Sequence, residues 1–432
     1  MKKYKLLKGY YGSPRITGEI LDCSMPMTFD SYSVCGFSCA YCFSFFQRSL
    51  GVGAENYFAK KFKVASINKF KKMFTDPDNY GGEFKEIIKN RITLQFGGLS
   101  DPFCPIEEEH GYGYEFLKFL REIDYPICFS SKGDLLIKPE GKKYLDLFSG
   151  AKNWSYKASI ITLDDEKSRL VEAGCPSPER RLQVLKTLSD MGIWTILRLR
   201  PFIIGVSGKY DISSNKFTDD NFIRLINRAK DIGFKAISTE FFCLELRNVN
   251  KGKLNFKTIS KACGFDIVQY YKNISNGSGY LRLNYEIKRP YMEKMEEICK
   301  EIGINFHVSD AHHKERGCSG SCCGLPQDES VSSFSKCQFT NALQIAKACG
   351  MVYWSDISKF GSYLKNHHYS INGLTSGAKD AEKRRNQTMY DTMRNIWNNP
   401  KSAKSPYKYF DGVLYPIGLD DNQDIIYEYR PR

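Results

Sequence analysis

Long apolar runs are absent from this sequence of 432 residues. No stretch approaches the roughly 18 consecutive apolar residues that a membrane-spanning helix needs, so an integral membrane protein is not expected. Residues 1–11 begin with lysines and hold no apolar segment of the kind found in secretory signals, so export is not expected either. Internal repeats and low-complexity tracts are also absent.

Acidic residues are outnumbered, with 49 Asp and Glu against 63 Lys and Arg, which gives a formal net charge of +14. Because 42% of the residues are hydrophobic, the chain can bury a core, and global disorder is excluded. The 15 cysteines are odd in number and partly clustered. In the reducing cytoplasm such clusters are typical of metal ligands rather than disulfides. We therefore expect a cytoplasmic, metal-binding protein.

Between residues 28 and 310, short apolar runs alternate with longer amphipathic stretches. The runs expected to form strands are 28–34, 91–96, 126–130, 158–162, 194–199 and 236–240. The stretches expected to form helices are 105–123, 139–148, 178–191 and 218–232. This alternation predicts an α/β fold in which a parallel sheet forms an open or closed barrel.

The flanking segments differ from this pattern. Residues 1–27 are basic and turn-rich, and we expect them to form an N-terminal extension of the domain at 28–310. Residues 311–432 are rich in Cys and His at first and then in Lys, Arg, Asn and Tyr, so we expect a separate C-terminal module.

The strongest motif is Cys35-Gly-Phe-Ser-Cys39-Ala-Tyr-Cys42, a C-x3-C-x2-C loop directly after the first expected strand. Three thiolates at this spacing can bind three irons of a [4Fe–4S] cluster and leave the fourth iron open. An open iron can bind the amino and carboxylate groups of S-adenosylmethionine (SAM). A partial zinc site or three core cysteines are the alternatives, but zinc loops usually pair C-x2-C with a second such pair.

This loop resembles that of the radical SAM superfamily, and residues 30–250 resemble the branch of spore photoproduct lyase and its DNA repair photolyase-like relatives. The resemblance implies a partial (β/α)6-type radical SAM barrel with a [4Fe–4S] cluster and SAM. The segments that carry it are 96–107, Ser131-Lys132, 159–162, 172–182 and 198–205.

Several residues in these segments suit SAM on chemical grounds. Gly97, Gly98 and Ser100 follow an expected strand, where glycine permits a close approach of backbone to ligand. Lys132 and Ser159 suit the SAM carboxylate and lie at the strand ends where barrel active sites form. An ordinary turn and a solvated rim lysine are the alternatives.

Four further charged side chains lie in these segments. Arg198 is expected to bind SAM, with a substrate phosphate or a structural role as alternatives, and the same choice applies to Arg200. Glu172 and Arg181 are expected to form a structural ion pair.

The resemblance implies that SAM is cleaved reductively and that the resulting 5′-deoxyadenosyl radical abstracts hydrogen from a substrate. The cofactor supplies this chemistry while the protein orients it and excludes water. In the lyase, a cysteine before the Ser-Asp step returns a hydrogen atom to the product radical, whereas this chain has Gly97, Gly98 and Leu99 there. Cys104 is the candidate substitute and Tyr41 a candidate radical relay, so thymine-dimer reversal itself is not expected.

A second cysteine group comprises Cys318, Cys322, Cys323 and Cys337, preceded by His312 and His313. Four soft ligands would complete a second iron–sulfur cluster or a zinc site. A cluster of reduced core cysteines is the alternative.

Basic residues concentrate in residues 1–15, in the lysine-rich segment 60–72 with Phe62 and Phe70, in 383–385 and in 401–409 near Trp397. Cations beside aromatic rings are typical of nucleic-acid surfaces. We therefore expect a radical enzyme that modifies or repairs nucleic acid, with flavodoxin or ferredoxin as electron donor. The alternatives are a radical enzyme that modifies a peptide or small molecule with an auxiliary cluster, and a non-catalytic metal-binding protein.

Overall fold

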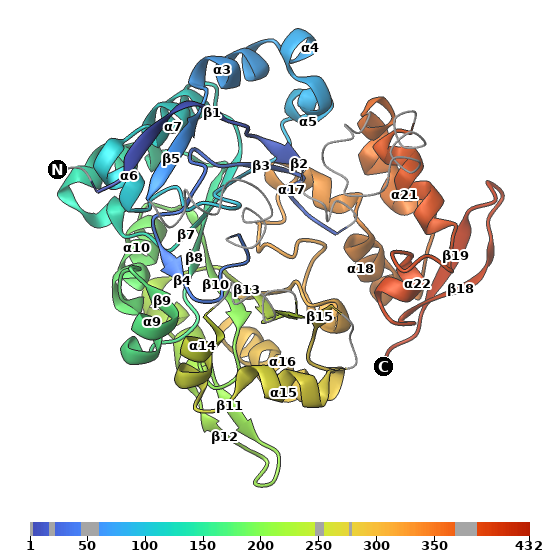
Figure 1. The fold of residues 1–432 in the computed structure, drawn as a ribbon. Helices are drawn as coiled ribbons and strands as arrows, with labels where there is room; N and C mark the ends of the chain where they lie inside the picture. The colour runs from blue at the N-terminus through green and yellow to red at the C-terminus, as the bar shows by residue number, and fades with distance from the viewer. Residues whose placement is uncertain (1–2, 17–21, 45–59, 247–254, 276–278, 368–386) are drawn as a thin grey trace.

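An eight-stranded sheet forms the centre of the computed structural model, which describes residues 3–16, 22–44, 60–246, 255–275, 279–367 and 387–432 (Figure 1). Its strand order is β16-β13-β10-β8-β7-β6-β3-β2. The strands are β2 (Arg15–Ile16), β3 (Met27–Phe29), β6 (Leu94–Phe96), β7 (Ile127–Ser131), β8 (Trp154–Ser159), β10 (Trp194–Phe202), β13 (Ala236–Phe241) and β16 (Asn305–Val308).

All neighbouring strands from β3 to β16 are parallel, and only β2 runs antiparallel to its neighbour β3. The predicted α/β fold with a parallel sheet is therefore confirmed. The sheet is open, with β16 and β2 as its edges, which is consistent with a partial barrel. The first expected strand is shorter than predicted, since β3 ends at Phe29.

Helices follow most of these strands, as the sequence pattern predicts. The helix α10 begins as expected, because the Ser177 side chain accepts a hydrogen bond from the Arg180 N–H and Pro178 occupies the first turn. The helix expected at 105–123 is split at Gly111, which adopts a left-handed conformation with φ of 69°. The helices that follow β6, β7, β8, β10 and β13 are α6 (Pro105–His110), α7 (Gly113–Glu122), α8 (Lys142–Phe148), α9 (Asp165–Val171), α10 (Pro178–Asp190), α11 (Asn221–Asn227), α12 (Ala229–Ile232), α14 (Phe256–Cys263), α15 (Ile267–Ile274) and α16 (Tyr285–Ile302).

The two faces of the sheet differ in chemistry, because successive side chains of a strand point to opposite faces. On one face, residues such as Phe129 and Leu197 join the main apolar core with the helices. The intervening residues, Cys128 and Ile196, belong to a separate small cluster on the other face. That face also carries Lys157, which is only 2% exposed. The sheet therefore has an apolar face under helices and a second, more polar face.

The C-terminal elements lie on the right in Figure 1, away from α6, α7, α9 and α10. They are α17 (Glu329–Lys336), α18 (Phe339–Cys349), β17 (Met351–Val352), α19 (Trp354–Ser358), α21 (Met389–Trp397), α22 (Pro406–Tyr409), β18 (Leu414–Leu419) and β19 (Ile425–Tyr429). Their apolar side chains continue the main core, which contains Phe96 of the sheet as well as Trp397 of α21. A division of the chain at residue 310 stays a prediction.

The basic N-terminal segment is ordered by pairing with a second basic segment. β1 (Lys5–Tyr11) runs parallel to β5 (Lys61–Ala65), with Lys5 opposite Lys61. None of the helices in the described part of the chain combines the length and apolar character of a membrane-spanning segment. None of the 15 cysteines, all of which lie in the described ranges, forms a disulfide.

Candidate active site at the carboxyl edge of the sheet

The three-cysteine loop follows β3 and is fixed to a distant part of the chain. Its residues Ser38 and Cys39 form the short strand β4 (Ser38–Cys39), which pairs with β9 (Glu172–Ala173). The Ala40 N–H also donates to the Val171 carbonyl at 2.8 Å. The loop and the 172–182 segment, both named from sequence, are therefore in contact.

Each of two loop thiols has another cysteine beside it. Cys39 Sγ lies 3.7 Å from Cys175 Sγ, and Cys35 is hydrogen-bonded to Cys104. The hydrogen bond from Cys175 lowers the pKa of Cys39, and Lys132 acts in the same direction against the effect of burial.

A metal centre is not preformed at these thiols. Within the described ranges, no three Cys, His, Asp or Glu side chains are grouped as ligands of a single metal ion. Three thiols within eight residues, in the loop after a strand of the main sheet, are nevertheless a donor set that suits an iron–sulfur cluster. A polynuclear cluster also spaces its ligands more widely than one ion does.

The loop from Gly97 to Ser100 is shaped by Asp30, which lies one residue beyond β3. Its Oδ1 accepts hydrogen bonds from the backbone N–H groups of Leu99 and Ser100, at 2.8 and 2.7 Å. Its Oδ2 receives the Arg15 guanidinium at 2.7 Å. Gly97 has φ of 92°, and a Cβ there would lie 2.7 Å from both Ser130 O and Pro102 Cδ. Only glycine fits this backbone path.

Lys132 extends from the end of β7 toward the cysteine loop. Its Nζ lies 5.6 Å from the centre of the Tyr41 ring and 4.0 Å from Glu172 Oε1. The backbone at this point is held by Asp101, whose carboxylate accepts hydrogen bonds from the Lys132 N–H at 2.5 Å and the Ser131 hydroxyl at 2.7 Å. The ammonium group therefore lies beside the loop, where it suits a carboxylate ligand.

Glu172 and Arg181 form the expected ion pair, with Nη2 and Oε2 2.6 Å apart and both side chains 1% exposed. Arg181 also donates to the Ser159 carbonyl at 2.8 Å, so it ties the end of β8 to the loop. The Tyr41 hydroxyl donates to the Glu172 carboxylate. Burial, followed by the charge of Glu172, raises the pKa of Tyr41 well above its usual value. Tyr41 is thus a neutral, hydrogen-bonded phenol, and a relay role stays a prediction.

Arginines of β10 occupy the polar face of the sheet near its carboxyl edge. Arg198 lies opposite Ser159 in register, and Arg200 forms an ion pair with Glu240 of β13. Burial and the neighbouring charge of Arg200 lower the pKa of Arg198 to about 10. This region has more positive than negative charge, which favours an anionic ligand.

Cys104 lies elsewhere. It is fully buried with Tyr32, Phe37 and Ile106 in a cluster outside the sheet. Its contact is with Cys35, so it stands behind a loop thiol and not among the polar-face residues. A catalytic role for Cys104 therefore gains no support from its position.

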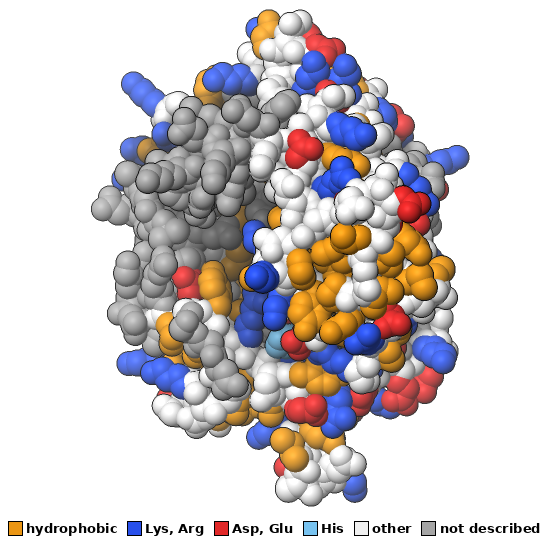
Figure 2. All heavy atoms as spheres, turned by 90° about the vertical axis from the view of Figure 1, so that its right-hand side faces the viewer, with side chains coloured by type: hydrophobic (Ala, Val, Ile, Leu, Met, Phe, Trp, Pro, Cys, Tyr) orange, Lys and Arg blue, Asp and Glu red, His pale blue; other side chains and the backbone are white. Residues whose placement is uncertain are grey.

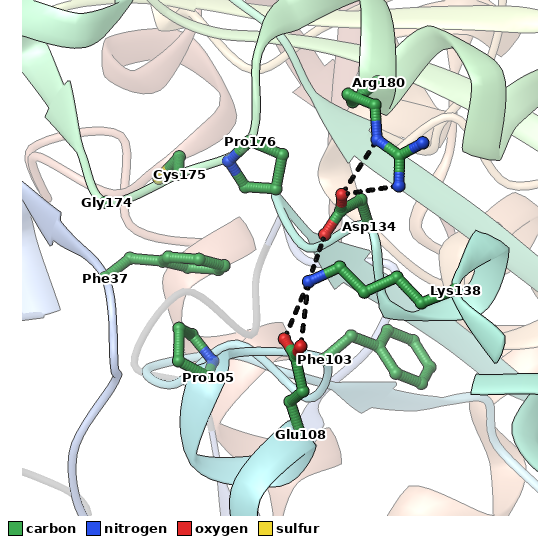
Figure 3. A pocket seen from close by; sticks show the side chains of 10 residues that line it. All are labelled: Phe37, Phe103, Pro105, Glu108, Asp134, Lys138, Gly174, Cys175, Pro176 and Arg180. Carbon is green, nitrogen blue, oxygen red and sulfur yellow. Dashed lines mark hydrogen bonds and ion pairs between the residues drawn. The ribbon is translucent and has the colours of Figure 1, made fainter. Parts of the chain in front are cut away.

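A cavity of about 280 Å³ borders the cysteine loop at Phe37 (Figure 3). Its wall includes Phe37 of the loop and Cys175, the thiol that contacts Cys39. Across it, an ion-pair chain joins Arg180 to Asp134, Asp134 to Lys138, and Lys138 to Glu108. The remaining lining residues are Phe103, Pro105, Gly174 and Pro176.

The cysteines of the predicted second site occupy three environments. Cys318 lies 3.8 Å from His307 Nε2, and the Cys322 and Cys323 thiols lie 3.7 Å apart. Cys337 instead packs beside Gly361, and its thiol donates to the Phe334 carbonyl at 3.0 Å. The four side chains are therefore not brought together, because spacing along the chain does not specify which side of a helix or loop each cysteine occupies. A second metal site made of these four stays a prediction.

The two histidines before this group are also not arranged as metal ligands. His312 Nδ1 lies 2.8 Å from the Lys288 ammonium, which forms an ion pair with Asp310 at 2.6 Å. His313 is fully buried and stacks on Tyr285, with ring centres 4.3 Å apart. Burial is the main cause that lowers the pKa of His313 to about 3. The negative charge of Asp310 raises this pKa, whereas the positive charges of Lys288 and Arg316 lower it further.

Replacing His313 with phenylalanine should reduce the acid sensitivity of the fold. In the unfolded chain this histidine takes up a proton near pH 6.5, but in the folded protein only near pH 3. Stability from this group is therefore complete above pH 6.5 and is lost as the pH falls toward 3. The variant should lower the slope of unfolding free energy against pH, between pH 6 and 4, by up to about 1.4 kcal/mol per pH unit. Urea denaturation across this pH range measures the slope. The control Tyr285→Phe keeps the ring that stacks on His313 and should have the slope of wild type. An unchanged slope in His313→Phe would show that His313 is not the group responsible for the acid sensitivity.

Some site residues could not be found from the sequence. Asp30 and Asp101 form hydrogen bonds with backbone groups that are distant in the sequence. Cys175, which contacts Cys39, lies in the 172–182 segment, where only Glu172 and Arg181 were assigned a role from sequence. Lys157 was not predicted as a site residue because it precedes the strand expected at 158–162, whereas β8 begins at Trp154. Asp30 falls inside the strand expected at 28–34, so the sequence pattern did not distinguish it.

No protein-family model matches the chain, and no curated protein is similar to it in sequence. Three solved structures share features of its fold. A spore photoproduct lyase variant with bound AdoMet and dinucleoside spore photoproduct is 13% identical, covers 70% of this chain and 86% of its own, and has a TM-score of 0.47. A spore photoproduct lyase complexed with dinucleoside spore photoproduct is 14% identical, with 70% and 86% covered and a TM-score of 0.45. SuiB of Streptococcus suis is 12% identical, with 66% and 50% covered and a TM-score of 0.38.

Proposed function

We propose that the protein is a radical SAM enzyme. The observation that supports this most strongly is the meeting of separate motifs at the carboxyl edge of one parallel sheet. The cysteine loop, the Gly97–Ser100 loop and Lys132 are joined there through Asp30, Tyr41 and Glu172. In barrels built from such strands, this edge is where active sites form.

Each part has a role in this proposal. Cys35, Cys39 and Cys42 would hold a [4Fe–4S] cluster, and the backbone at Gly97, Gly98 and Ser100 would receive the SAM amino group. Lys132, Ser159 and Arg198 would bind the carboxylate and nearby polar groups of SAM. Asp30 and Asp101 position these backbone segments, since both carboxylates accept backbone N–H groups there.

The bound cluster and SAM would supply a 5′-deoxyadenosyl radical that abstracts hydrogen from the substrate. The chain's own residues orient SAM and limit the access of water, because Tyr41, Glu172 and Arg181 form a buried hydrogen-bonded wall beside Lys132. An electron donor of flavodoxin or ferredoxin type would reduce the cluster. The fifteen free thiols suit a reducing cytoplasm.

The test is SAM cleavage without a substrate. Anaerobically reconstituted protein, given dithionite and SAM, is expected to form 5′-deoxyadenosine, and Cys39→Ala is expected to form none above background. Cys349→Ala, which changes an exposed cysteine of α18, is the matched control and should retain activity. Equal product from Cys39→Ala and wild type would contradict the proposal.

Nucleic acid is the proposed substrate class, and the paired strands β1 and β5 support it. They bring the basic segments at 1–15 and 60–72 into one ribbon in which Lys5 and Lys8 are exposed, Lys61 and Lys63 are half-buried, and Tyr10 is 67% exposed. Figure 2 shows further Lys and Arg side chains gathered at a hollow on the side of the C-terminal elements.

The aromatic residues named from sequence are not part of this surface. Phe62, Phe70 and Trp397 are at most 2% exposed, so they belong to the core and cannot stack on bases. Their positions along the helix or strand point their side chains toward the core. Burying a large aromatic ring stabilises the fold, so these rings are not left on the surface to stack on bases. The segment 383–385 lies outside the described residues. The peptide-modifying alternative loses support as well, because the cysteines of its auxiliary cluster are not together.

Binding to single-stranded oligonucleotides should fall steeply with salt. Four lysines on phosphates give a slope of about −3 in log affinity against log salt, which is about 50-fold weaker binding at 200 mM than at 50 mM. Alanine at Lys5, Lys8, Lys61 and Lys63 should remove most of this dependence. Alanine at Lys142 and Lys186, two exposed helix lysines that pair with acids, should not. Fluorescence anisotropy measures both, and salt-independent or absent binding would favour a small-molecule or peptide substrate.

A further inference from the structure

The segment from Ser321 to Leu325 lies across the polar face of the sheet and is clamped to three strands. The Ser238 hydroxyl of β13 donates to the Cys322 carbonyl at 2.8 Å, and His307 Nδ1 of β16 lies 2.7 Å from the Ser321 carbonyl. The Trp194 indole of β10 donates to the Gly324 carbonyl at 2.8 Å. A side chain at Gly324 would meet Ile196 Cγ2 at 2.8 Å. This segment is thus packed directly on the sheet.

The clamp fixes two neighbouring thiols inside the fold. Cys322 and Cys323 are 6% and 7% exposed, and their sulfur atoms lie 3.7 Å apart. Lys157, Arg198 and Arg200 are the cations that act on Cys323. The pair therefore lies on the face of the sheet that carries these cations, and Arg198 is opposite Ser238, the residue that binds the Cys322 carbonyl.

The register of the strands β8, β10 and β13 aligns this pair with residues of the proposed SAM site. Ser159 at the end of β8 lies opposite Arg198 of β10, and Arg198 lies opposite Ser238 of β13. Ser238 is the residue that holds Cys322. A continuous row across the sheet therefore leads from a proposed SAM contact to the thiol pair.

Other buried thiols are less well placed. Cys104 lies in a separate cluster against Cys35. Cys128 is three residues before the end of β7, and its thiol faces the Phe129 carbonyl at 3.9 Å. Among the described cysteines, only Cys322 and Cys323 combine a close sulfur pair with the arginines of β10.

We propose that the Cys322–Cys323 pair is the hydrogen-atom donor of the reaction. This rests on the proposed function, in which hydrogen abstraction leaves a carbon-centred radical. One thiol of the pair gives up its hydrogen atom, so that its S–H bond breaks, a C–H bond forms and a sulfur-centred radical remains. One electron from the low-potential donor that the cluster already requires, together with one proton from solvent, then restores the thiol.

The second sulfur explains why a pair is present. At 3.7 Å the second sulfur can share the unpaired electron left on the first, so the radical is spread over both sulfurs until one electron and one proton restore the thiol.

Deuterium labelling tests this without a known substrate. In D2O the thiols carry deuterium, and in the absence of substrate the 5′-deoxyadenosyl radical should take it from the pair. Anaerobic, reconstituted protein is given SAM and dithionite in D2O, and mass spectrometry measures deuterium in 5′-deoxyadenosine. Wild type is expected to give mainly singly deuterated product, and Cys322→Ser/Cys323→Ser at least fivefold less label. Serine keeps the size and polarity of the side chain, but its O–H bond is too strong to donate.

The outcomes separate the inference from the function on which it rests. Cys128→Ala, a buried thiol of the same face, is the matched control and should keep the label. Unlabelled product from wild type, or full label in the double serine variant, overturns the inference while the enzyme still cleaves SAM. Loss of label in Cys104→Ala instead would assign the donor to that residue. If wild type forms no 5′-deoxyadenosine at all, the proposed function fails and the inference fails with it.

Discussion

Replacing Arg181 with methionine is expected to lower the free energy of unfolding by about 3–5 kcal/mol, the usual cost of removing one partner of a buried ion pair. The guanidinium and the Glu172 carboxylate lie 2.6 Å apart, and both side chains are 1% exposed. Without Arg181, the carboxylate remains buried with Tyr41, Ser168 and the more distant Lys132 as partners. The Ser159 carbonyl also loses its hydrogen bond.

Burial alone would raise the pKa of Glu172, but Arg181 and then Lys132 outweigh burial and keep it lowered. The variant should therefore leave the Glu172 carboxylate buried without its main positive partner. Urea denaturation measures the loss, with Arg169→Met as control, because that exposed arginine pairs with Asp165 on one helix and contributes only about 0.3–0.5 kcal/mol. A double change to methionine at Arg181 and glutamine at Glu172 should recover part of the stability. A loss below about 1 kcal/mol in Arg181→Met would show that the pair is not a structural link.

Alanine at Gly97 is expected to cost about 2–5 kcal/mol and to abolish measurable SAM binding. The left-handed backbone alone costs about 1–2 kcal/mol for a residue with a Cβ. A Cβ 2.7 Å from Ser130 O and Pro102 Cδ adds about 1–3 kcal/mol of overpacking. Relief of these contacts must move the Gly97–Ser100 loop away from Asp30, and with it the backbone that would receive SAM.

Two control variants separate conformation from contact. Gly192 has φ of 80° and no atom within 4 Å of its would-be Cβ, so Gly192→Ala should show the conformational cost alone and leave SAM binding unchanged. Gly98→Ala would meet Thr28 Cβ at 3.2 Å and should have an intermediate effect. Calorimetry with SAM and urea denaturation together measure both properties. Wild-type SAM affinity in Gly97→Ala would contradict the role of this loop.

The strands of the main sheet and the helices between them could be predicted because the sequence patterns that specify them are local. Alternating apolar runs and the Ser177 cap are read within a few residues, and the structure places them as expected. Contact between the cysteine loop and the Glu172 segment was not predicted, because the contacting residues Tyr41 and Glu172 lie 131 residues apart in the sequence. The edge strand β16 was missed because four residues give too short a pattern.

Residues that act across the sheet could not be predicted. Asp30 binds backbone groups about 70 residues away, and Cys322 is placed by Ser238 and His307, so neither role is visible in local spacing. Spacing also grouped Cys337 with Cys322, although the fold separates their surroundings. Aromatic residues between lysines were interpreted as a surface, but Phe62 and Phe70 point to the core.

The most direct test of the central claim is electron paramagnetic resonance of the dithionite-reduced protein, with iron and sulfide analysis, in the presence and absence of SAM. The comparison is between wild type and a variant with alanine at Cys35, Cys39 and Cys42. The account predicts a reduced-cluster signal in wild type that SAM changes, and its absence in the triple variant. A protein that holds only zinc, or a cluster signal that SAM leaves unchanged, would contradict it.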